Sequence, residues 1–189
     1  MRIVKADSEI IKRLEKNGIS KEMLSFFQTS KWLVIAEQND EIVGAAGVGG
    51  IFNLAGVEIQ EKYYGKGLGA LLQRKLIQES KERGYSFNTV MINPKNESSV
   101  KLHNSFGFLK CFRINYSVGM IQDVGILAFN WKGRLVEKFL KNFNNKINMI
   151  FLACLLKMLK SLFPFIINLN EKDIPTPSIK WIIKNFEKI

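Results

Sequence analysis

The spacing of hydrophobic and polar positions predicts two short helices and then strands in the N-terminal part of the chain. The helices are expected within residues 8–29, separated at Asn17-Gly18. Two apolar runs follow, and the turn residues Asn39-Asp40 between them predict a β-hairpin. A third extended run over 53–60 contains Gly56. A glycine inside a strand often marks a bulge or a close approach of the backbone.

The middle of the chain predicts a further alternation of helices and strands. Its clearest helix is expected over residues 68–83, where leucines fall at helical spacing and Gly84 supplies the stop. The order of elements, α-α-β-β-β-α-β-α-β-β, indicates a mixed α/β fold. The remaining elements of this region are a buried strand over 87–92, a helix over 97–105, and strands over 108–118 and 124–131.

Beyond Trp131 the pattern changes to amphipathic helices. Apolar side chains recur every four residues over 135–147, and the Asn-rich stretch NFNNKIN is expected to weaken or kink this helix. Residues 149–156 are apolar all round, before lysines interrupt and Pro164 follows, and they fall short of the ~20 residues that cross a bilayer. A last helix is expected to begin near Ser178. We therefore predict a domain over residues 1–130 and a basic helical extension over 131–189.

Composition and charge narrow the class of protein. Of 189 residues, 47% are hydrophobic and 24% charged, which is too apolar for a disordered chain. The net charge of +11 is uneven, because residues 131–189 hold 11 Lys and Arg against 4 Asp and Glu. Such asymmetry is typical of a segment that faces an anionic membrane or nucleic acid, and a solvated lysine-rich face is the alternative.

The partners of this basic extension stay open on sequence alone. Core packing is the commonest use of an apolar helix stripe, which favours packing on the domain or a homodimer through the C-terminal helices. Peripheral membrane contact is a further alternative. Nucleic acid is the least expected partner, since the extension contains no recognisable reader motif.

The titratable residues exclude several kinds of site. Two cysteines, Cys111 and Cys154, cannot build a disulfide scaffold, and Cys111 is expected to be a buried small hydrophobe rather than a nucleophile. With a single histidine and no Cys/His cluster, no metal site is expected. The N-terminus turns polar within seven residues, which does not resemble a signal peptide. We therefore expect a cytoplasmic protein, with or without peripheral attachment to a membrane.

The most informative segment is the glycine-rich stretch QEKYYGKGLGALL over residues 60–72. Three glycines, at positions 65, 67 and 69, lie between an expected strand and the leucine-rich helix. Glycine allows tight turns and lets backbone N–H groups approach a ligand without an intervening Cβ. The start of a helix adds unpaired N–H donors and a partial positive charge, and Lys66 adds a full one. This combination suits a phosphate or pyrophosphate.

Two better-known phosphate loops fit this stretch poorly. A P-loop would require glycine where Gln60 stands, and no Ser or Thr follows the lysine. The dinucleotide fingerprint GxGxxA matches residues 65–70 literally, but no acidic residue ends the next strand and only one βαβ unit follows. A glycine-rich turn without any ligand is the remaining alternative.

A second motif, NESSVKLHNSFGF over residues 96–108, resolves these alternatives. Together the two segments resemble the GNAT superfamily of N-acetyltransferases. That family uses a Q/R-x-x-G-x-G/A loop for the pyrophosphate of acyl-CoA and a later helix of the form N-x-x-A-x-x-L-Y-x-x-x-G-F. The resemblance spans roughly residues 2–130. Here the helix reads Asn96, Ser99 for the alanine, Leu102, His103 for the tyrosine and then Gly107-Phe108, while Tyr64 replaces the Gln or Arg of the loop.

The resemblance implies a GNAT-like α/β fold, with a mixed, mostly antiparallel central sheet flanked by helices and followed by a C-terminal helical extension. Acetyl-CoA is the implied co-substrate, and residues 1–130 become its binding domain. The strands near 53–60 and 87–92 are expected to splay apart and admit the pantetheine arm. The implied cofactor-binding residues are Glu58, Ile59, Gln60 and Glu61 for the arm, Tyr64, Gly65, Lys66, Gly67, Leu68, Gly69 and Ala70 for the pyrophosphate, and Asn96 and His103 near the thioester.

The resemblance also implies the chemistry, in which an amine attacks the thioester directly. His103 stands where the family has a tyrosine that protonates the departing thiolate, and it is either that proton donor or a packed helix histidine. Some relatives use a glutamate early in the third strand as base, but the matching Asn53 cannot titrate. Glu58 and Glu61 are the nearby carboxylates, and a water chain is the alternative. We predict an N-acetyltransferase acting on a primary amine, with Glu58 and His103 as candidate catalytic residues. A non-catalytic CoA-binding or regulatory module is the alternative.

Overall fold

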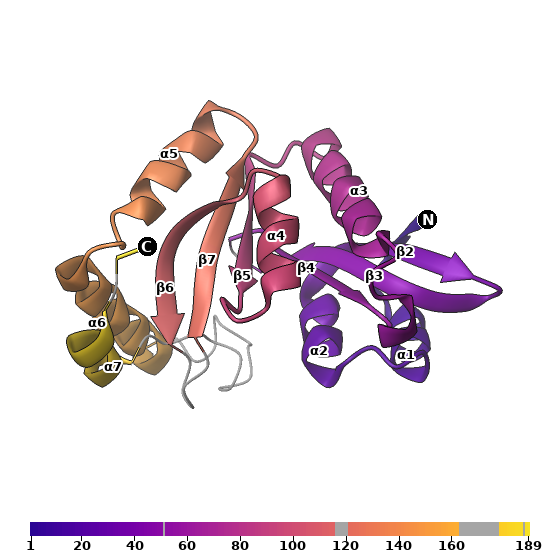
Figure 1. Cartoon of the computed structure of the whole chain (residues 1–189), viewed down its shortest axis with the longest axis horizontal. Helices are drawn as coiled ribbons and strands as arrows, with labels where there is room; N and C mark the ends of the chain where they lie inside the picture. Colours follow the sequence, from indigo (N-terminus) through magenta and orange to yellow (C-terminus); the bar gives the residue numbers. More distant parts are fainter. Residues whose placement is uncertain (51, 116–120, 163–177, 187) are drawn as a thin grey trace. The chain divides into compact units, whose positions relative to one another are not determined.

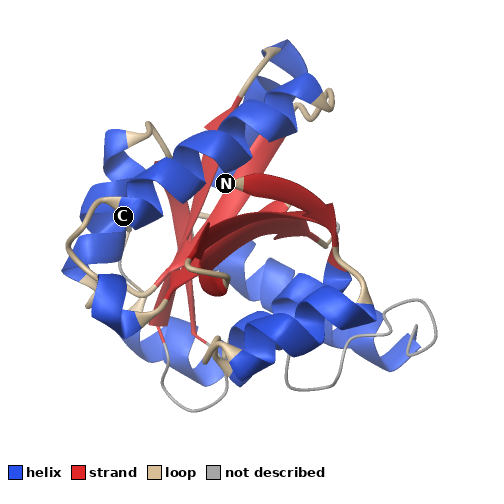
Figure 2. Ribbon diagram, turned by 90° about the vertical axis from the view of Figure 1, so that its right-hand side faces the viewer, coloured by secondary structure: helices blue, strands red, loops and turns tan. Residues whose placement is uncertain are grey.

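The computed structural model describes residues 1–50, 52–115, 121–162, 178–186 and 188–189. Seven strands form one sheet in the order β1-β2-β3-β4-β5-β7-β6, flanked by helices (Figures 1 and 2). Neighbouring strands with a determined register run antiparallel except for the parallel pair β4 and β5. The mixed, mostly antiparallel fold expected from the sequence is therefore confirmed.

The element bounds follow the sequence pattern closely in the middle of the chain. The strands are β1 (Arg2–Lys5), β2 (Ser30–Gln38), β3 (Glu41–Gly49), β4 (Leu54–Ile59), β5 (Phe87–Ile92), β6 (Leu109–Asn115) and β7 (Ile121–Ala128). The helices are α1 (Ser8–Lys16), α2 (Lys21–Thr29), a 3-10 turn η1 (Glu61–Tyr63), α3 (Leu68–Glu82), α4 (Glu97–Ser105), α5 (Trp131–Lys141), α6 (Lys146–Leu162) and α7 (Ile179–Asn185).

The chain is divided into two compact units. The N-terminal unit comprises residues 1–90 and 127–131, and the C-terminal unit comprises 91–126 and 132–189. The division at residues 130 and 131 that composition and charge suggest remains a prediction.

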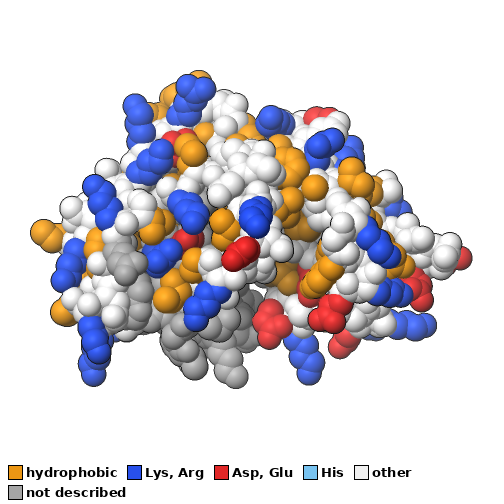
Figure 3. Space-filling model, viewed as in Figure 1, with side chains coloured by type: hydrophobic (Ala, Val, Ile, Leu, Met, Phe, Trp, Pro, Cys, Tyr) orange, Lys and Arg blue, Asp and Glu red, His pale blue; other side chains and the backbone are white. Residues whose placement is uncertain are grey.

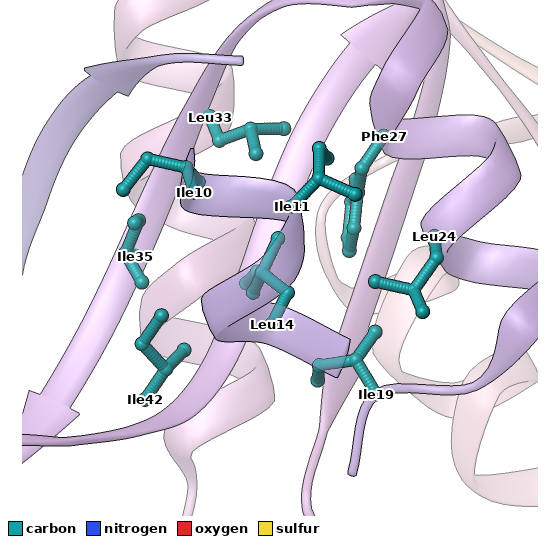
Figure 4. Packing of buried hydrophobic residues seen from close by; sticks show 10 residues of the cluster. Ile10, Ile11, Leu14, Ile19, Leu24, Phe27, Leu33, Ile35 and Ile42 are labelled. Atoms are coloured by element: carbon teal, nitrogen blue, oxygen red, sulfur yellow. The ribbon is translucent and has the colours of Figure 1, made fainter. Parts of the chain in front are cut away.

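The core of the N-terminal unit lies between α1, α2 and the β2–β3 hairpin. Leu14 and Phe27 from the helices and Leu33, Ile35 and Ile42 from the strands are all fully buried (Figure 4). Burying each of these side chains contributes about 1.5–3 kcal/mol relative to exposure. The predicted hairpin forms, and its two turn residues both adopt positive φ, as a tight hairpin turn requires.

Gly56 in β4 marks a close approach rather than a bulge. The register between β3 and β4 runs without interruption past this position. A Cβ at Gly56 would lie 2.6 Å from a ring carbon of Phe26 and 2.9 Å from the methyl carbon of Met23, both on α2. The missing side chain therefore lets α2 pack directly on the sheet.

The helices of the C-terminal unit are separated where asparagines accumulate. The predicted weakening of the helix is confirmed, because α5 ends at Lys141 and α6 begins at Lys146. Asn145 caps the new helix by accepting a hydrogen bond from Ile147 N–H at 2.9 Å. Met149 and Ala153 of α6 and Ile182 of α7 are buried, so one side of each helix packs inside this unit.

Two elements differ from expectation. β1 was not expected, because a four-residue strand is too short to show a periodic pattern, yet it pairs antiparallel with β2. β7 begins and ends three residues earlier than predicted, since Trp131 starts α5 instead of ending the strand. The expected strand end at Val118 lies outside the described residues, as does Pro164.

Candidate functional site

The glycine loop between η1 and α3 has a backbone conformation that is compatible with the predicted phosphate cradle. Gly65 and Gly67 have φ values of +74° and +75°, a left-handed conformation that side-chain-bearing residues adopt only with strain. Gly67 is the N-cap of α3, and its carbonyl accepts the first helical bond from Leu71 N–H at 3.1 Å. No side chain caps the first turn. The first N–H groups of α3 are thus uncapped donors at an exposed loop.

Positive charge and an aromatic ring flank this loop. Lys66 Nζ lies 5.0 Å and Lys62 Nζ 5.3 Å from the centre of the Tyr63 ring, both within cation–π range. Tyr64, which replaces the family's Gln or Arg, is 60% exposed. The charge of Lys66 therefore lies at the surface of the loop, beside the Tyr63 ring.

β4 and β5 are joined only where the two strands begin. Their single register position places Leu54 opposite Thr89. Asn53 secures this end, because its carbonyl accepts from Thr89 N–H at 3.0 Å and its side-chain amide donates to Phe87 O at 3.2 Å. Within the described part of the chain, β4 beyond Leu54 pairs with β3 alone. Asn53 is thus a structural residue, and the rest of β4 has an edge free of β5.

The strand alternation decides which β4 amides point to that edge. Gln60 N–H donates to Val43 O on β3 at 3.0 Å. Because hydrogen-bonded and non-hydrogen-bonded positions alternate in an antiparallel pair, the backbone of Glu58 faces β3 as well. The groups that face away from β3 belong to Val57 and Ile59. Among the residues whose backbone was predicted to contact the cofactor, Ile59 faces the free edge, whereas Glu58 and Gln60 face β3. Val57 also faces the free edge, and strand alternation alone would have identified it.

Glu58 lies on the α2 side of the sheet and is tied to the start of that helix. Its carboxylate accepts from Ser20 Oγ at 3.0 Å and from Ser20 N–H at 3.2 and 3.3 Å. Burial raises the pKa of the Glu58 carboxyl above its ordinary value, the hydrogen bonds from Ser20 lower it, and the charge of Glu22 raises it further. A half-buried carboxylate with a raised pKa is a better proton acceptor than one at its ordinary pKa.

Asn96 and His103 belong to the C-terminal unit, on α4. The side chain of Asn96 is occupied as the N-cap, where its Oδ1 accepts from Ser99 N–H at 3.0 Å. His103 is only 9% exposed, and its ring packs edge-on against Phe108 with centroids 5.4 Å apart. The packing is that of a core histidine at the end of a short helix.

The protonation of His103 follows from its hydrogen bond. Nδ1 lies 2.7 Å from the carbonyl oxygen of Ser99. A carbonyl oxygen only accepts, so Nδ1 carries the proton and Nε2 of the neutral ring does not. Burial lowers the pKa of His103, outweighing the Ser99 bond that raises it, which favours this neutral form. Packing therefore accounts for the contacts of His103, and its role as a proton donor remains a prediction.

The structure brings part of the predicted site together within one unit. The cradle loop, β4 and Glu58 all belong to the N-terminal unit, whereas Asn96 and His103 belong to the other. Glu61, expected beside the pantetheine arm, begins η1 and is exposed. No group of three or more His, Cys, Asp or Glu side chains with metal-binding geometry is found among the described residues.

A pocket of about 440 Å³ in the C-terminal unit is not part of this arrangement. Cys111 at its wall is buried, as expected, and burial raises the pKa of its thiol to about 11. Two lysines of the pocket are already paired with carboxylates, Lys110 with Asp123 at 3.2 Å and Lys141 with Glu137 at 2.7 Å.

Comparisons with known proteins identify the family and the fold. The profile of the Acetyltransferase (GNAT) domain matches residues 5–121. A putative acetyltransferase from Salmonella typhimurium, solved with its cofactor acetyl-CoA, is 20% identical with a TM-score of 0.53 over 69% of this chain and 94% of its own. A GNAT family acetyltransferase from Elizabethkingia anophelis with acetyl-CoA bound is 17% identical, with a TM-score of 0.54 over 68% and 97%.

A further structure with this fold is an IAA acetyltransferase from Bacillus cereus, 16% identical with a TM-score of 0.55 over 68% of this chain and 97% of its own. At these identities the likeness concerns the fold. A search of curated proteins finds no match.

Proposed function

Because the chain belongs to the GNAT family of acetyltransferases, we propose that it transfers an acetyl group from acetyl-CoA to a primary amine by direct attack of the amine. The observation that carries the proposal is the uncapped N-terminus of α3, which follows two left-handed glycines. A helix start of this kind binds phosphate through its N–H groups and its dipole.

The residues of the N-terminal unit fit acetyl-CoA. A Cβ added at Gly65 or Gly67 would meet no atom within 4 Å, so the space above the loop is open. Backbone N–H groups from Tyr64 to Ala70 would hold the pyrophosphate, assisted by Lys66. The amides of the pantetheine arm would pair with the free edge of β4 at Val57 and Ile59, adjacent to the predicted Glu58, Gln60 and Glu61.

Glu58 is the group that we assign as general base. The attacking amine must lose a proton, and the raised pKa of the Glu58 carboxyl lets its carboxylate accept one, directly or through one water. The amine nitrogen forms the new C–N bond as the C–S bond breaks, and the electron pair leaves with the sulfur. A backbone N–H at the β4 edge would stabilise the negative charge that develops on the carbonyl oxygen.

In this proposal, His103 does not have the proton-donor role that its place in the motif implies. Its bare Nε2 can accept a hydrogen bond but cannot donate a proton to the leaving thiolate. We therefore propose that His103 stabilises the C-terminal end of α4 by packing, and that a water molecule protonates the sulfur. The family's tyrosine role is not carried over to this residue.

The test is a paired measurement on the full chain. Acetyl-CoA binding is measured by calorimetry, and thiol release is measured with alkyl amines, amino acids and lysine-containing peptides as acceptors. We expect binding together with amine-dependent release. Glu58→Gln should retain acetyl-CoA binding and lower kcat by about 10²-fold or more. The matched control is Glu15→Gln, an exposed carboxylate on α1, which should change neither quantity.

The alternative function, a CoA-binding or regulatory module without catalysis, is favoured by one observation, namely the buried and neutral His103 in place of a proton donor. Acetyl-CoA binding without thiol release against every acceptor would support it. Absence of binding would exclude both functions.

A further inference from the structure

The outer face of α5 carries a stripe of exposed apolar side chains. Trp131, Leu135 and Phe139 are 67%, 56% and 58% exposed. They recur every four residues, which places them along one side of the helix. The opposite side is buried at Gly133 and Leu140. The stripe is therefore the outward face of a helix that already packs on its other side.

Basic residues border this stripe on both sides. At 3.6 residues per turn, Arg134 and Lys138 fall along one border and Lys132 along the other. All three side chains are exposed, and the single acid of the helix, Glu137, is paired with Lys141 at 2.7 Å. Lys and Arg side chains gather at the upper left of Figure 3, where Figure 1 places α5.

The following helix repeats the pattern. Ile147, Phe151 and Met158 of α6 are 76%, 64% and 51% exposed, and they lie on one side of that helix. Lys146 and Lys157 are exposed on the same helix. The exposed apolar character of α5 is thus shared by its neighbour within one unit.

We propose that α5 lies in the headgroup region of an anionic phospholipid membrane, with Trp131, Leu135 and Phe139 inserted and Lys132, Arg134 and Lys138 against the lipid phosphates. Aromatic and aliphatic side chains on one face with Lys and Arg at its borders are typical of interfacial helices. Residues 131–189 carry 11 Lys and Arg against 4 Asp and Glu, which complements such a surface. No described helix meets the length and apolarity needed to cross a bilayer.

A second copy of the chain fits this face less well. A symmetric dimer would place the basic borders of the two stripes against each other, which is repulsive. Three side chains exposed by little more than half offer on the order of a few hundred Å², less than the roughly 800 Å² per partner of a stable protein interface. Nucleic acid would engage the basic borders but leave the apolar stripe exposed.

The experiment is flotation of the full chain with vesicles. We expect binding to vesicles of phosphatidylcholine with about 30% phosphatidylglycerol at about 0.05 M salt, weak binding to phosphatidylcholine alone, and loss of binding near 0.5 M salt. Leu135→Gln with Phe139→Gln tests the stripe, and Arg134→Glu with Lys138→Glu tests its border. Each pair should weaken binding to the anionic vesicles by about tenfold or more.

Matched controls separate this surface from general effects. Lys12→Glu with Lys31→Glu makes the same change in net charge at exposed positions on α1 and β2, and Ile3→Gln with Leu109→Gln makes exposed apolar residues of β1 and β6 polar. Both control pairs should bind as the unaltered chain does. Circular dichroism on all variants confirms that each one is folded.

None of these measurements depends on acetyl transfer, so they test the membrane proposal independently of the proposed function. It is overturned if the unaltered chain does not float with anionic vesicles, or if folded stripe and control variants bind alike. It is also overturned if size-exclusion chromatography shows a dimer that the stripe variants dissociate, or if an unrelated-sequence DNA duplex competes and binding depends on the border alone.

Discussion

Glu58 Oε2 accepts a hydrogen bond from Ser20 Oγ at 3.0 Å, while the same hydroxyl oxygen accepts from Met23 N–H at 3.3 Å as the N-cap of α2. One serine thus connects the candidate base on β4 with the first turn of the helix that packs on that side of the sheet. The ionisation of Glu58 and the start of α2 are coupled through it. A change at Ser20 should be visible in both stability and pH dependence.

Ser20→Ala should shift the acid limb of the pH–rate profile upward. The hydrogen bonds from Ser20 lower the pKa of Glu58, so removal of the hydroxyl raises that pKa further. A base acts in its ionised form, and therefore activity should begin to fall at a higher pH than in the unaltered chain. The free energy of unfolding should drop by about 1 kcal/mol from loss of the cap. The pH–rate profile is measured from rates across pH, and the free energy of unfolding is measured by urea denaturation.

Asp7→Ala is the matched control for this variant. Asp7 caps α1 by accepting from Ile10 N–H at 3.0 Å and has no contact with Glu58. It should lose a similar free energy of unfolding with no movement of the acid limb. An equal shift in both variants would mean that stability, and not Glu58, sets the profile.

Gly67→Ala should weaken acetyl-CoA binding by about tenfold or more, because strain in the left-handed N-cap moves the N–H donors of the cradle. Gly84→Ala is an unusually close control. Gly84 has a φ of +77° at the other end of α3, and a Cβ there would also meet no atom within 4 Å. Calorimetry should show weakened binding for Gly67→Ala only. Equal losses would remove the cradle from the binding site.

His103 should be neutral with its proton on Nδ1 at pH 7. It is the single histidine of the chain, so its ¹⁵N shifts in a two-dimensional NMR spectrum are assigned without ambiguity. Burial lowers the pKa of His103 below the ordinary value of about 6.5. Between the ordinary pKa and the lower pKa in the folded chain, the unfolded chain binds more protons than the folded chain. Stability should therefore decrease as pH falls through this window. His103→Gln should flatten that decrease, and a proton on Nε2 would contradict the assignment.

Asp123→Asn should destabilise the fold strongly. Asp123 is fully buried and paired with Arg113 Nε at 2.6 Å and Lys110 Nζ at 3.2 Å. Removing its charge breaks both ion pairs at a buried position, which costs about 3 kcal/mol of unfolding free energy. Glu37→Gln is the control, because Glu37 bridges Arg2 and Arg13 at the surface, where solvent screens the pairs. Urea denaturation should show a much smaller loss for the control, and comparable losses would argue against a buried network.

The helix and strand pattern was readable from the sequence wherever a local signal existed. α4 and β5 have the predicted bounds because local signals mark both ends of each element. These signals are a capping residue or a proline at one end and a glycine or a polar turn at the other. The left-handed glycines of the cradle were likewise visible, since few other residues take that conformation at low cost. The four-residue β1 was invisible, because its only stabilisation is pairing with β2.

What local pattern could not supply is the environment of each side chain. The residue at 103 was recognised by its position in a motif, yet its protonation depends on burial and on a carbonyl one turn away. The role of Asn53 in joining β4 to β5 and the link between Glu58 and Ser20 arise from chain segments more than thirty residues apart. Amino-acid order determined the elements and the backbone cradle of this protein, because those depend on neighbours along the chain. Only the tertiary structure decided that Glu58 contacts Ser20 and that His103 is buried against the carbonyl of Ser99, because desolvation and hydrogen bonding depend on neighbours in space.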